Sequence, residues 1–511
     1  MGDIKAVRVA CSAAVLFMLS ATLLSAQTFQ TLVNFNGTDG ADPTSSLVQG
    51  LDGSLYGTTY GDAYNKDPYG KVFSIDASGT MSVFYNFCYQ SNCLDGMKPY
   101  GGLVLGTDGN FYGTTVYGGT TGVGTVFKIN PEGELTTLYS FCPEGLPRCI
   151  DGANPQGGLA QGADGSFYGT TQGGGANCYS VLSYGCGSVF KITPTGELTT
   201  IYSFCPQDNC TGGVSPVGSL LLGTDGSLYG VATGGGSANA GTIFSITSTG
   251  SFTTIYSFCQ KLLCADGKFP SGGLVQNTDG ALYGTTSAGG AFSDVGTIFK
   301  ITLRGELTTL YRFCEDIRSG PGLPPNWFSK CPDGIDPVEG LVLSSNRNFY
   351  GITYAGGILQ NATNNCDYSC GTIFRITPQG QLTTLHRFDG SDGNQPVGGL
   401  FQATNGKIYG TTYFGGTVCF YCGTVFQLGL GLDPFVLANP GFGKPGRVIQ
   451  ILGDQLAETS AVTFNGAPAR FEVISDTLIK ATVPPAATTG TIEVTTATGT
   501  LESNVAFHVL P

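Results

Sequence analysis

The stretch Asp108-Gly-Asn-Phe-Tyr-Gly-Thr-Thr115 combines a tight Asp-Gly turn with a short strand, and versions of it recur along the chain. Its Tyr-Gly pair returns at Tyr56, Tyr112, Tyr168, Tyr229, Tyr283, Tyr350 and Tyr409. Successive copies are 54 to 67 residues apart, which is the length of one supersecondary unit. The spacing predicts a repeat architecture.

Each repeat predicts four antiparallel strands. In the second copy these cover residues 102–105, 110–115, 124–129 and 134–141, with turns between them. Val126, Phe127 and Ile129 place apolar groups on both faces of the third strand. A sheet that is buried on both faces is typical of a blade packed between neighbouring blades, so the pattern predicts an all-β propeller.

The two ends of the array predict how it closes. Residues 28–35 match the fourth strand of a repeat, as at 381–388, but they precede the first repeat. The seventh repeat stops after Leu428 without a fourth strand of its own. We expect seven blades, with the N-terminal strand completing the last blade and removing its open edge. The alternative, an open solenoid, would need capping repeats that the sequence does not contain.

Composition excludes several classes of protein. The 511 residues include 80 glycines and 12% charged residues, which suits many short strands joined by tight turns. A hydrophobic content of 41% argues against disorder. The formal net charge of -13 argues against a nucleic-acid partner, which calls for a basic surface.

Residues 1–26 are typical of a cleaved export signal. Lys5 and Arg8 precede an apolar run from Val9 to Leu24, and Ser25-Ala26 offers a cleavage site. An uncleaved membrane anchor is the alternative. No later stretch is long enough to span a membrane. We therefore expect a monomer that is secreted to the periplasm or the exterior, or associated with the cell surface.

The cysteines support export. Sixteen of them form near-neighbour pairs, for which local disulfides are the expected state in an oxidising compartment. The pairs are Cys88 with Cys93, Cys142 with Cys149, Cys178 with Cys186, Cys205 with Cys210, Cys259 with Cys264, Cys314 with Cys331, Cys366 with Cys370, and Cys419 with Cys422. All eight lie in second-to-third strand loops or blade crossings, which share one face of a propeller. The alternative is a zinc site formed by Cys366, Cys370, Cys419 and Cys422.

From residue 433 to 511 the repeat pattern ends and alternating strands predict a small β-sandwich. This segment resembles an IPT/TIG immunoglobulin-like domain. The matching pieces are Asn439-Pro440-Gly441, Ile451-x-Gly453, Val462-Thr-Phe464-Asn-Gly466, Val483-Pro484-Pro485, and Gly490 with Ile492-x-Val494. The resemblance implies a spacer or interaction module without catalysis.

The propeller segment, residues 27–430, resembles the GloVer-type tandem repeats of exported bacterial proteins. The resemblance covers residues 29–428 and rests on Asp-Gly-x-Leu/Phe-Tyr-Gly-Thr-Thr and Gly-Thr-Val/Ile-Phe-x-Ile. It implies a cell-surface context and no particular chemistry.

An Asp-Gly-x-x-Pro element opens six of the seven crossings into a first strand. Its aspartates are Asp39, Asp95, Asp151, Asp266, Asp333 and Asp392, and Gly212 replaces the aspartate in the fourth repeat. If the first strands line the axis, these carboxylates would ring one mouth of the channel and offer a Ca²⁺ site. The alternative interpretation is an Asx-type turn that starts each strand. No other cofactor is indicated.

Aromatic residues in the bridged loops are the candidate binding residues. Rings on rigid loops suit stacking on sugars or anchoring of a protein partner, and the alternative is that they pack over the loop stems. They are Trp327, Phe328, Tyr179, Tyr184, Tyr368, Phe420 and Tyr421.

These observations favour a secreted, non-enzymatic recognition or surface-interaction scaffold that binds a glycan or a cell-surface protein through the disulfide-bearing face. His386 and His508 are the only histidines, which argues against a histidine-dependent hydrolase. The alternative function is a carbohydrate-active enzyme, a polysaccharide lyase or glycosidase, that uses channel-mouth carboxylates as acid and base. An enzyme needs an unequal pair of carboxylates with shifted pKa values, whereas a scaffold needs equivalent positions around the ring.

Overall fold

The computed structural model describes residues 27–61, 67–146, 148–176, 186–206, 210–290, 294–315, 331–357 and 370–510. The expected signal segment, 1–26, lies outside them. Within these ranges the regular structure is β-strand, apart from the single 3₁₀ turns η1 (Ser91–Cys93) and η2 (Leu262–Cys264). None of the described segments forms a helix with the length and apolar character needed to cross a membrane.

In the described part of the chain, the first 429 residues form seven four-stranded antiparallel sheets. The first sheet contains β2 (Val48–Gln49), β3 (Leu55–Thr59), β4 (Lys71–Ile75) and β5 (Met81–Asn86). The second contains β6 (Val104–Leu105), β7 (Phe111–Thr115), β8 (Thr125–Ile129) and β9 (Leu135–Ser140). The third contains β10 (Ala160–Gln161), β11 (Phe167–Thr171), β12 (Ser188–Ile192) and β13 (Leu198–Ser203). The fourth sheet contains β14 (Val214–Leu222), β15 (Leu228–Gly234), β16 (Thr242–Ile246) and β17 (Phe252–Ser257). The fifth contains β18 (Lys268–Gln276), β19 (Leu282–Ala288), β20 (Thr297–Ile301) and β21 (Leu307–Arg312). The sixth contains β22 (Val342–Leu343), β23 (Phe349–Thr353), β24 (Thr372–Ile376) and β25 (Leu382–Arg387).

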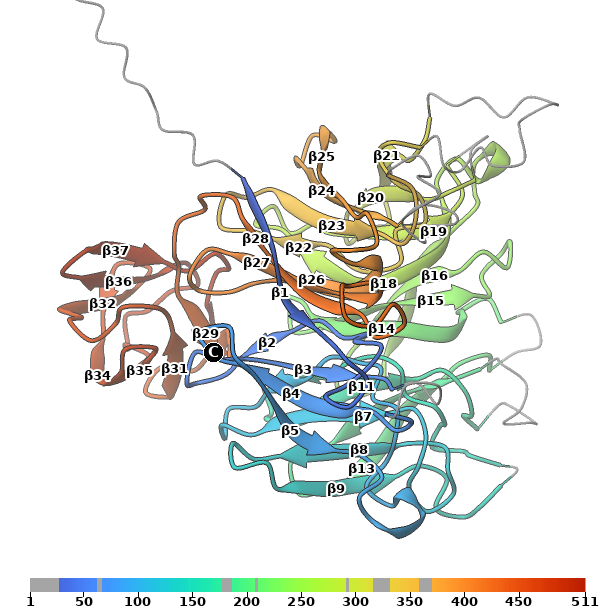
Figure 1. Cartoon of the computed structure of the whole chain (residues 1–511), viewed down its shortest axis with the longest axis horizontal. Coiled ribbons are helices and arrows are strands. Elements are labelled where there is room, and N and C mark those ends of the chain that lie inside the picture. The colour runs from blue at the N-terminus through green and yellow to red at the C-terminus, as the bar shows by residue number, and fades with distance from the viewer. Residues whose placement is uncertain are drawn as a thin grey trace, which may run out of the picture.

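The last sheet joins the two ends of the array. It consists of β26 (Asn394–Gln402), β27 (Ile408–Phe414), β28 (Thr424–Gly429) and the N-terminal strand β1 (Thr28–Asn34). β1 pairs antiparallel with β28, from Thr28 opposite Gly429 to Asn34 opposite Thr424. The predicted role of the N-terminal strand is confirmed, and Figure 1 shows β1 lying beside β28, although the two strands are far apart in the sequence.

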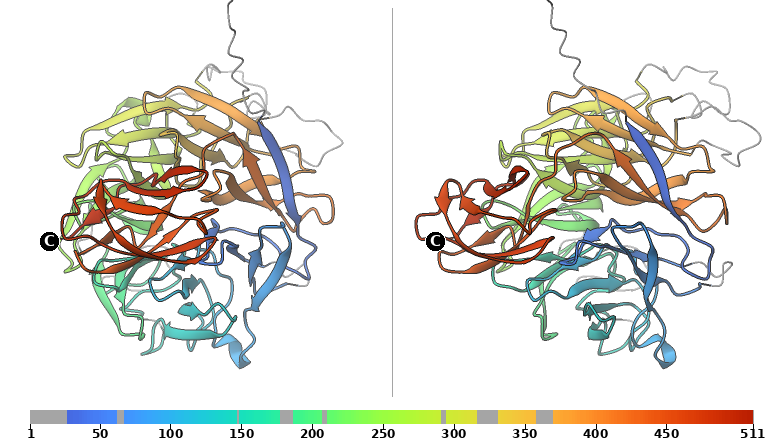
Figure 2. Two further views of the ribbon diagram at one scale, coloured as in Figure 1. Left: turned by 90° about the vertical axis from the view of Figure 1, so that its left-hand side faces the viewer. Right: turned by 60° about the vertical axis from the view of Figure 1, so that its left-hand side comes forward.

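The hydrophobic core lies between neighbouring sheets. Tyr112 and Val126 of the second sheet pack with Leu159 and Phe190 of the third, and all four side chains are buried. A corresponding cluster unites the last sheet with the first through Val33 and Phe73, so the packing runs around a complete ring. Figure 2 shows the sheets arranged around this ring, as in a β-propeller.

The repeated Tyr-Gly pair serves this packing. The Tyr112 ring stacks on Phe167 of the next sheet at 3.9 Å between centroids, and its hydroxyl donates to Asp108 at 2.7 Å. A Cβ atom on Gly113 would lie 2.6 Å from the Phe127 ring. The glycine therefore makes room for an aromatic ring of its own sheet.

The C-terminal region is a small β-sandwich, as predicted. One sheet has the order β29 (Leu437–Asn439), β31 (Val448–Leu452), β35 (Leu478–Thr482) and β34 (Arg470–Ser475). The other has the order β33 (Ala467–Pro468), β32 (Ala461–Phe464), β36 (Ile492–Thr496) and β37 (Gly499–Glu502), and β30 (Phe442–Gly443) pairs in parallel with β38 (His508–Val509). Buried Ile451, Val462 and Phe464 contribute to its core.

This domain sits on the face of the ring that carries the first-to-second strand turns (Figure 2). The Thr477 hydroxyl donates to the Leu51 carbonyl at 2.9 Å, and the Asn439 amide donates to the Gly106 carbonyl at 3.3 Å. Leu51 and Gly106 both belong to such turns. The opposite face, which bears the disulfide loops, is left uncovered by the domain.

Candidate functional site

The crossing aspartates anchor loops to outer strands. Asp266 is fully buried and accepts hydrogen bonds from the Tyr256 hydroxyl at 2.8 Å and from the Gln260 N–H at 2.9 Å. Burial and the contact with Asp266 raise the pKa of the Tyr256 phenol well above its usual range. The carboxylate thus joins a disulfide loop to the fourth strand of the preceding sheet.

The other aspartates have the same kind of partner. Asp95, Asp151 and Asp333 accept from tyrosine hydroxyls at 2.8, 3.0 and 2.8 Å, and Asp392 contacts His386 Nε2 at 2.7 Å. Asp39 accepts instead from the backbone and side chain of Asn36. None of the six lines the channel. The expected carboxylate ring does not form around this cavity, because five of the aspartates face a partner on an outer strand and Asp39 bonds to Asn36.

No group of three or more His, Cys, Asp or Glu side chains placed to hold a metal ion occurs within the described ranges. The aspartates accept from N–H groups that precede them in the chain, as Asp266 does from Gln260 and Asp151 from Cys142. These bonds hold the preceding loop and are not those of the Asx-type turn in the alternative interpretation.

Six predicted cysteine pairs are disulfides in the described residues. They join Cys88 to Cys93, Cys142 to Cys149, Cys205 to Cys210, Cys259 to Cys264, Cys314 to Cys331, and Cys419 to Cys422. Cys186 and Cys370 are disulfide-bonded as well, while their predicted partners, Cys178 and Cys366, lie outside the described residues. The alternative zinc site is wrong, because three of its four cysteines are already disulfide-bonded.

The cysteines themselves belong to the loop stems and not to the exposed surface of this face. Cys331 is fully buried, and its carbonyl accepts hydrogen bonds from the N–H groups of Gly334 and Gly357. Cys210 is half-buried, and its carbonyl accepts in the same way from Gly213 and Gly236. Both residues therefore tie a crossing to the second-to-third strand loop of the following sheet. They are structural residues, and any binding surface on this face must come from the side chains between the bridges.

The disulfide loops display apolar side chains to solvent. The most exposed are Leu262 at 86%, Tyr89 at 83%, Val418 at 62%, Leu146 at 59% and Tyr421 at 54%. Each lies inside a disulfide loop or next to one of its cysteines. These side chains are spread over four loops, and exposed apolar groups mark an interaction surface where they lie together as one patch.

Two of the predicted aromatic binding residues can be placed. Phe420 and Tyr421 contact each other with 4.9 Å between ring centroids, and both pack near Phe414 at the end of β27. The Tyr421 ring is supported at its edge and still reaches solvent. Trp327, Phe328, Tyr179, Tyr184 and Tyr368 lie outside the described residues.

One residue in each crossing has a left-handed backbone just before the proline that opens the innermost segment. Phe269 has φ 56°, and its N–H donates to the Ala240 carbonyl of the preceding sheet at 2.7 Å. The same conformation occurs at Asp42, Lys98, Asn154, Ser215, Asp336 and Gln395. For residues other than glycine this conformation costs roughly 1–3 kcal/mol and persists only where its surroundings impose it. A constant backbone thus presents six kinds of side chain over the seven repeats, with aspartate at both Asp42 and Asp336.

These residues lead directly into the central channel, which holds a cavity of about 350 Å³. Its wall is largely glycine backbone from the innermost segments, with Tyr100, Gln156, Ser219 and Ser271 among the side chains. The glycines are needed because the segments nearly touch. A Cβ atom on Gly157 would lie 2.2 Å from the Gly218 carbonyl oxygen.

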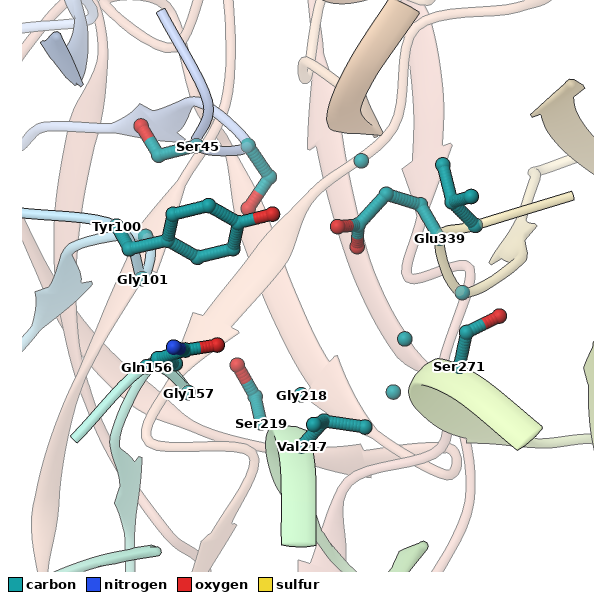
Figure 3. Close-up of a pocket in the computed structure, with 18 of the residues that line it drawn as sticks. Ser45, Tyr100, Gly101, Gln156, Gly157, Val217, Gly218, Ser219, Ser271 and Glu339 are labelled. Carbon is teal, nitrogen blue, oxygen red and sulfur yellow. The ribbon is translucent and has the colours of Figure 1, made fainter. Parts of the chain in front are cut away.

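Glu339 is the single carboxylate among the described residues that line this cavity. Burial raises its pKa to about 8. The neighbouring Tyr100 phenol has its pKa raised to about 12 by burial and by the nearby Glu339 carboxylate. Figure 3 shows the carboxylate and the Tyr100 hydroxyl pointing toward each other across the pocket.

Sequence reasoning missed Glu339, although a signal exists. Four of the seven innermost segments have a Pro-x-Gly-Gly-Leu pattern, as in Pro155-Gln-Gly-Gly-Leu159, and two others have serine at one or both glycine positions. In the sixth repeat this becomes Pro337-Val-Glu-Gly-Leu341, with a carboxylate in place of the first glycine. Glu339 can therefore be found by looking for positions where one repeat differs in charge from the others.

Comparison with known proteins agrees with the repeat and with the terminal domain. The family model described as Gloeobacter/Verrucomicrobia repeat matches residues 13–183, 147–325 and 326–436, and the IPT/TIG domain model matches residues 437–509. No curated protein matches the chain.

Solved structures show only distant likenesses. A fungal AA5-family alcohol oxidase in complex with copper is 13% identical with a TM-score of 0.44, covering 95% of this chain and 99% of that one. A putative gluconolactonase is 12% identical with a TM-score of 0.37, covering 80% and 94%. A putative glucose dehydrogenase of a Thermus species is 13% identical with a TM-score of 0.37, covering 79% and 99%. At this distance none of them bears on activity. The repeat model covers most of the sequence, so the chain belongs to the Gloeobacter/Verrucomicrobia repeat family and carries a C-terminal IPT/TIG domain.

Proposed function

We propose that this protein is an extracellular, non-enzymatic recognition scaffold that binds a protein surface through its disulfide-loop face. The observation that carries the proposal is the display of apolar side chains by the disulfide loops, led by Leu262, Tyr89 and Val418. Aliphatic side chains on rigid loops anchor protein partners by burial, and short disulfides limit the entropy lost on binding.

Other features support this assignment. The terminal domain occupies the opposite face, so both can be used at once, one as spacer and the other as binding surface. The disulfides support an oxidising, extracellular setting.

The enzymatic alternative receives less support. Glycosidases need two carboxylates about 5–10 Å apart, and Glu339 has no second carboxylate beside it among the described channel residues.

Adhesion of the purified full chain to cells of the producing organism tests the proposal. The variant Leu262→Asp/Leu263→Asp places two charges on η2, where both side chains are exposed. We expect it to lower binding at least tenfold, because charges would have to be desolvated in the interface. The matched control is Ile474→Asp, an exposed apolar site in the terminal domain, and it should bind normally.

Binding to cells that have been treated with protease or with periodate identifies the chemical class of the partner. Protease treatment should abolish binding, and periodate oxidation of cell-surface sugars should not. Loss after periodate alone would assign a glycan partner. Equal binding by the double variant and the unmodified chain would remove the loop face from consideration.

A further inference from the structure

We propose that the channel cavity is a binding site for the primary ammonium group of a small organic amine, with Glu339 as its counter-ion. The proposal goes beyond the loop-face function and does not depend on it, since the cavity is lined by different residues.

The charge of the cavity wall favours a cationic ligand. Within the described part of the chain the cavity wall contains Glu339 and no lysine, arginine or histidine. A carboxylate that is shielded from bulk water attracts a positive ligand more strongly than it would in water. An anionic ligand would find no cationic partner among the described residues of the wall.

The polar groups of the wall are mainly oxygen acceptors. The Glu339 carboxylate has one hydrogen-bond donor among the described residues, the Gly340 N–H. The Tyr100 hydroxyl lies opposite (Figure 3), and Ser46 and Ser219 line the same cavity. An ammonium group carries three donors and no acceptor, so it matches this set better than an alcohol does.

Tyr100 is the aromatic side chain of the described cavity wall, and its phenol is near the Glu339 carboxylate. Tyr60 packs edge-on against Tyr100 with 5.9 Å between ring centroids. The Lys98 ammonium lies 4.3 Å from the centre of the Tyr60 ring and donates to the Gly61 carbonyl, so this lysine is engaged outside the cavity wall. An ammonium ligand beside Glu339 would therefore meet Tyr100 as its aromatic neighbour.

The size of the cavity limits the ligand. About 350 Å³ is at the lower end of the range for small-molecule sites, and the glycine backbones around it cannot move apart without separating the sheets. The occupant is a short aliphatic amine or the amino group of one sugar residue.

Protonation of Glu339 makes the site dependent on pH. Its raised pKa, about 8, keeps the empty site mostly neutral at pH 6 and ionised at pH 9. The groups that face it are Tyr100 and, beyond it, Tyr60, Tyr354 and the cation Lys98. Binding of an ammonium group favours the ionised carboxylate, so affinity should rise with pH over this interval.

Calorimetric titration of the full chain tests the proposal with n-propylammonium as the probe, whose pKa, like that of lysine, is about 10.4 or slightly above. We expect its affinity to rise at least about tenfold from pH 6 to pH 9. At pH 9, Glu339→Gln should weaken binding at least tenfold and Tyr100→Phe about threefold. The control Glu197→Gln, at an exposed turn, should change nothing.

Three further probes make the result decisive. n-Propanol removes the charge, tetramethylammonium removes the N–H donors, and KCl supplies an inorganic cation. Binding of propylammonium alone supports the proposal. Equal affinity for n-propanol, tighter binding of K⁺, or no binding of propylammonium at pH 9 by a correctly folded chain would each overturn it. Adhesion of Glu339→Gln to cells, expected to be unchanged, separates this outcome from that of the loop-face test.

Discussion

At the scale of single residues, the pair formed by a crossing aspartate and a fourth-strand tyrosine explains how loops of variable sequence keep one geometry. Asp266 accepts from the Tyr256 hydroxyl and from two loop N–H groups, those of Gln260 and Lys261. The pair thus joins the stem of the loop closed by Cys259 and Cys264 to a strand that is already held in its sheet.

Removing the tyrosine hydroxyl should lower the free energy of unfolding only in a repeat whose crossing has the aspartate. Tyr256→Phe leaves the buried Asp266 carboxylate without one donor, so we expect the free energy of unfolding to fall by about 1.5–3 kcal/mol. The matched control is Tyr202→Phe, because the equivalent crossing has Gly212 in place of the aspartate. Chemical denaturation of both variants measures the difference. Equal losses would contradict this account.

Glu339 predicts a pH dependence of stability. Its folded pKa, about 8, lies above the unfolded value of 4.5, so the protonated form is preferred in the folded state. The contribution to stability is complete below pH 4.5 and is lost as the pH rises through 8. Each pH unit in this window removes up to about 1.4 kcal/mol. Thermal melts should therefore show Glu339→Gln becoming more stable than the unmodified chain toward pH 9, with little difference at pH 4. An identical pH profile for both proteins would contradict the assignment.

At the scale of elements, the short disulfide loops add local constraint to sheets that are already held by packing. Cys259 and Cys264 are five residues apart and enclose η2, whereas the strands beside them bury Phe258 and Phe299 between sheets. The loop-forming role and the sheet-forming role thus fall on different residues.

Replacing both cysteines of one loop should therefore weaken the fold without opening it. For Cys259→Ser/Cys264→Ser we expect a loss of about 2 kcal/mol from the chain-entropy model, with the β-sheet circular dichroism retained. A matched replacement of Cys142 and Cys149 should behave alike, since that loop is of similar length. Complete unfolding of either variant would show that a disulfide loop is required for the sheets.

At the scale of the whole molecule, closure depends on one strand. β1 joins β28, and its Val33 packs in the cluster between the last and first sheets together with Phe35, which directly follows the strand. Phe29 of β1 stacks on His386 with 3.7 Å between ring centroids. Its contacts therefore reach both neighbours of the last sheet.

Deleting residues 28–34 should leave the edge of β28 unpaired and part of two interfaces exposed. We expect a lower melting temperature and association into dimers or larger species through the free edge. Size-exclusion chromatography with thermal denaturation checks this result. A stable monomer with an unchanged melting temperature would show that the ring closes without β1.

Sequence alone determined the repeat, the four strands of each unit, the closing strand, six of the cysteine pairs and the terminal sandwich. These features follow from periodicity and from partners close in the chain, such as Tyr112 and Asp108, or from a strand missing at one end and spare at the other. Tertiary structure decided the rest. It turned five of the six crossing aspartates toward outer strands of the preceding sheet and gathered innermost segments from distant repeats around Glu339. The physical reason is that such contacts depend on which strands meet when the sheets close into a ring, and no local pattern in the sequence records that.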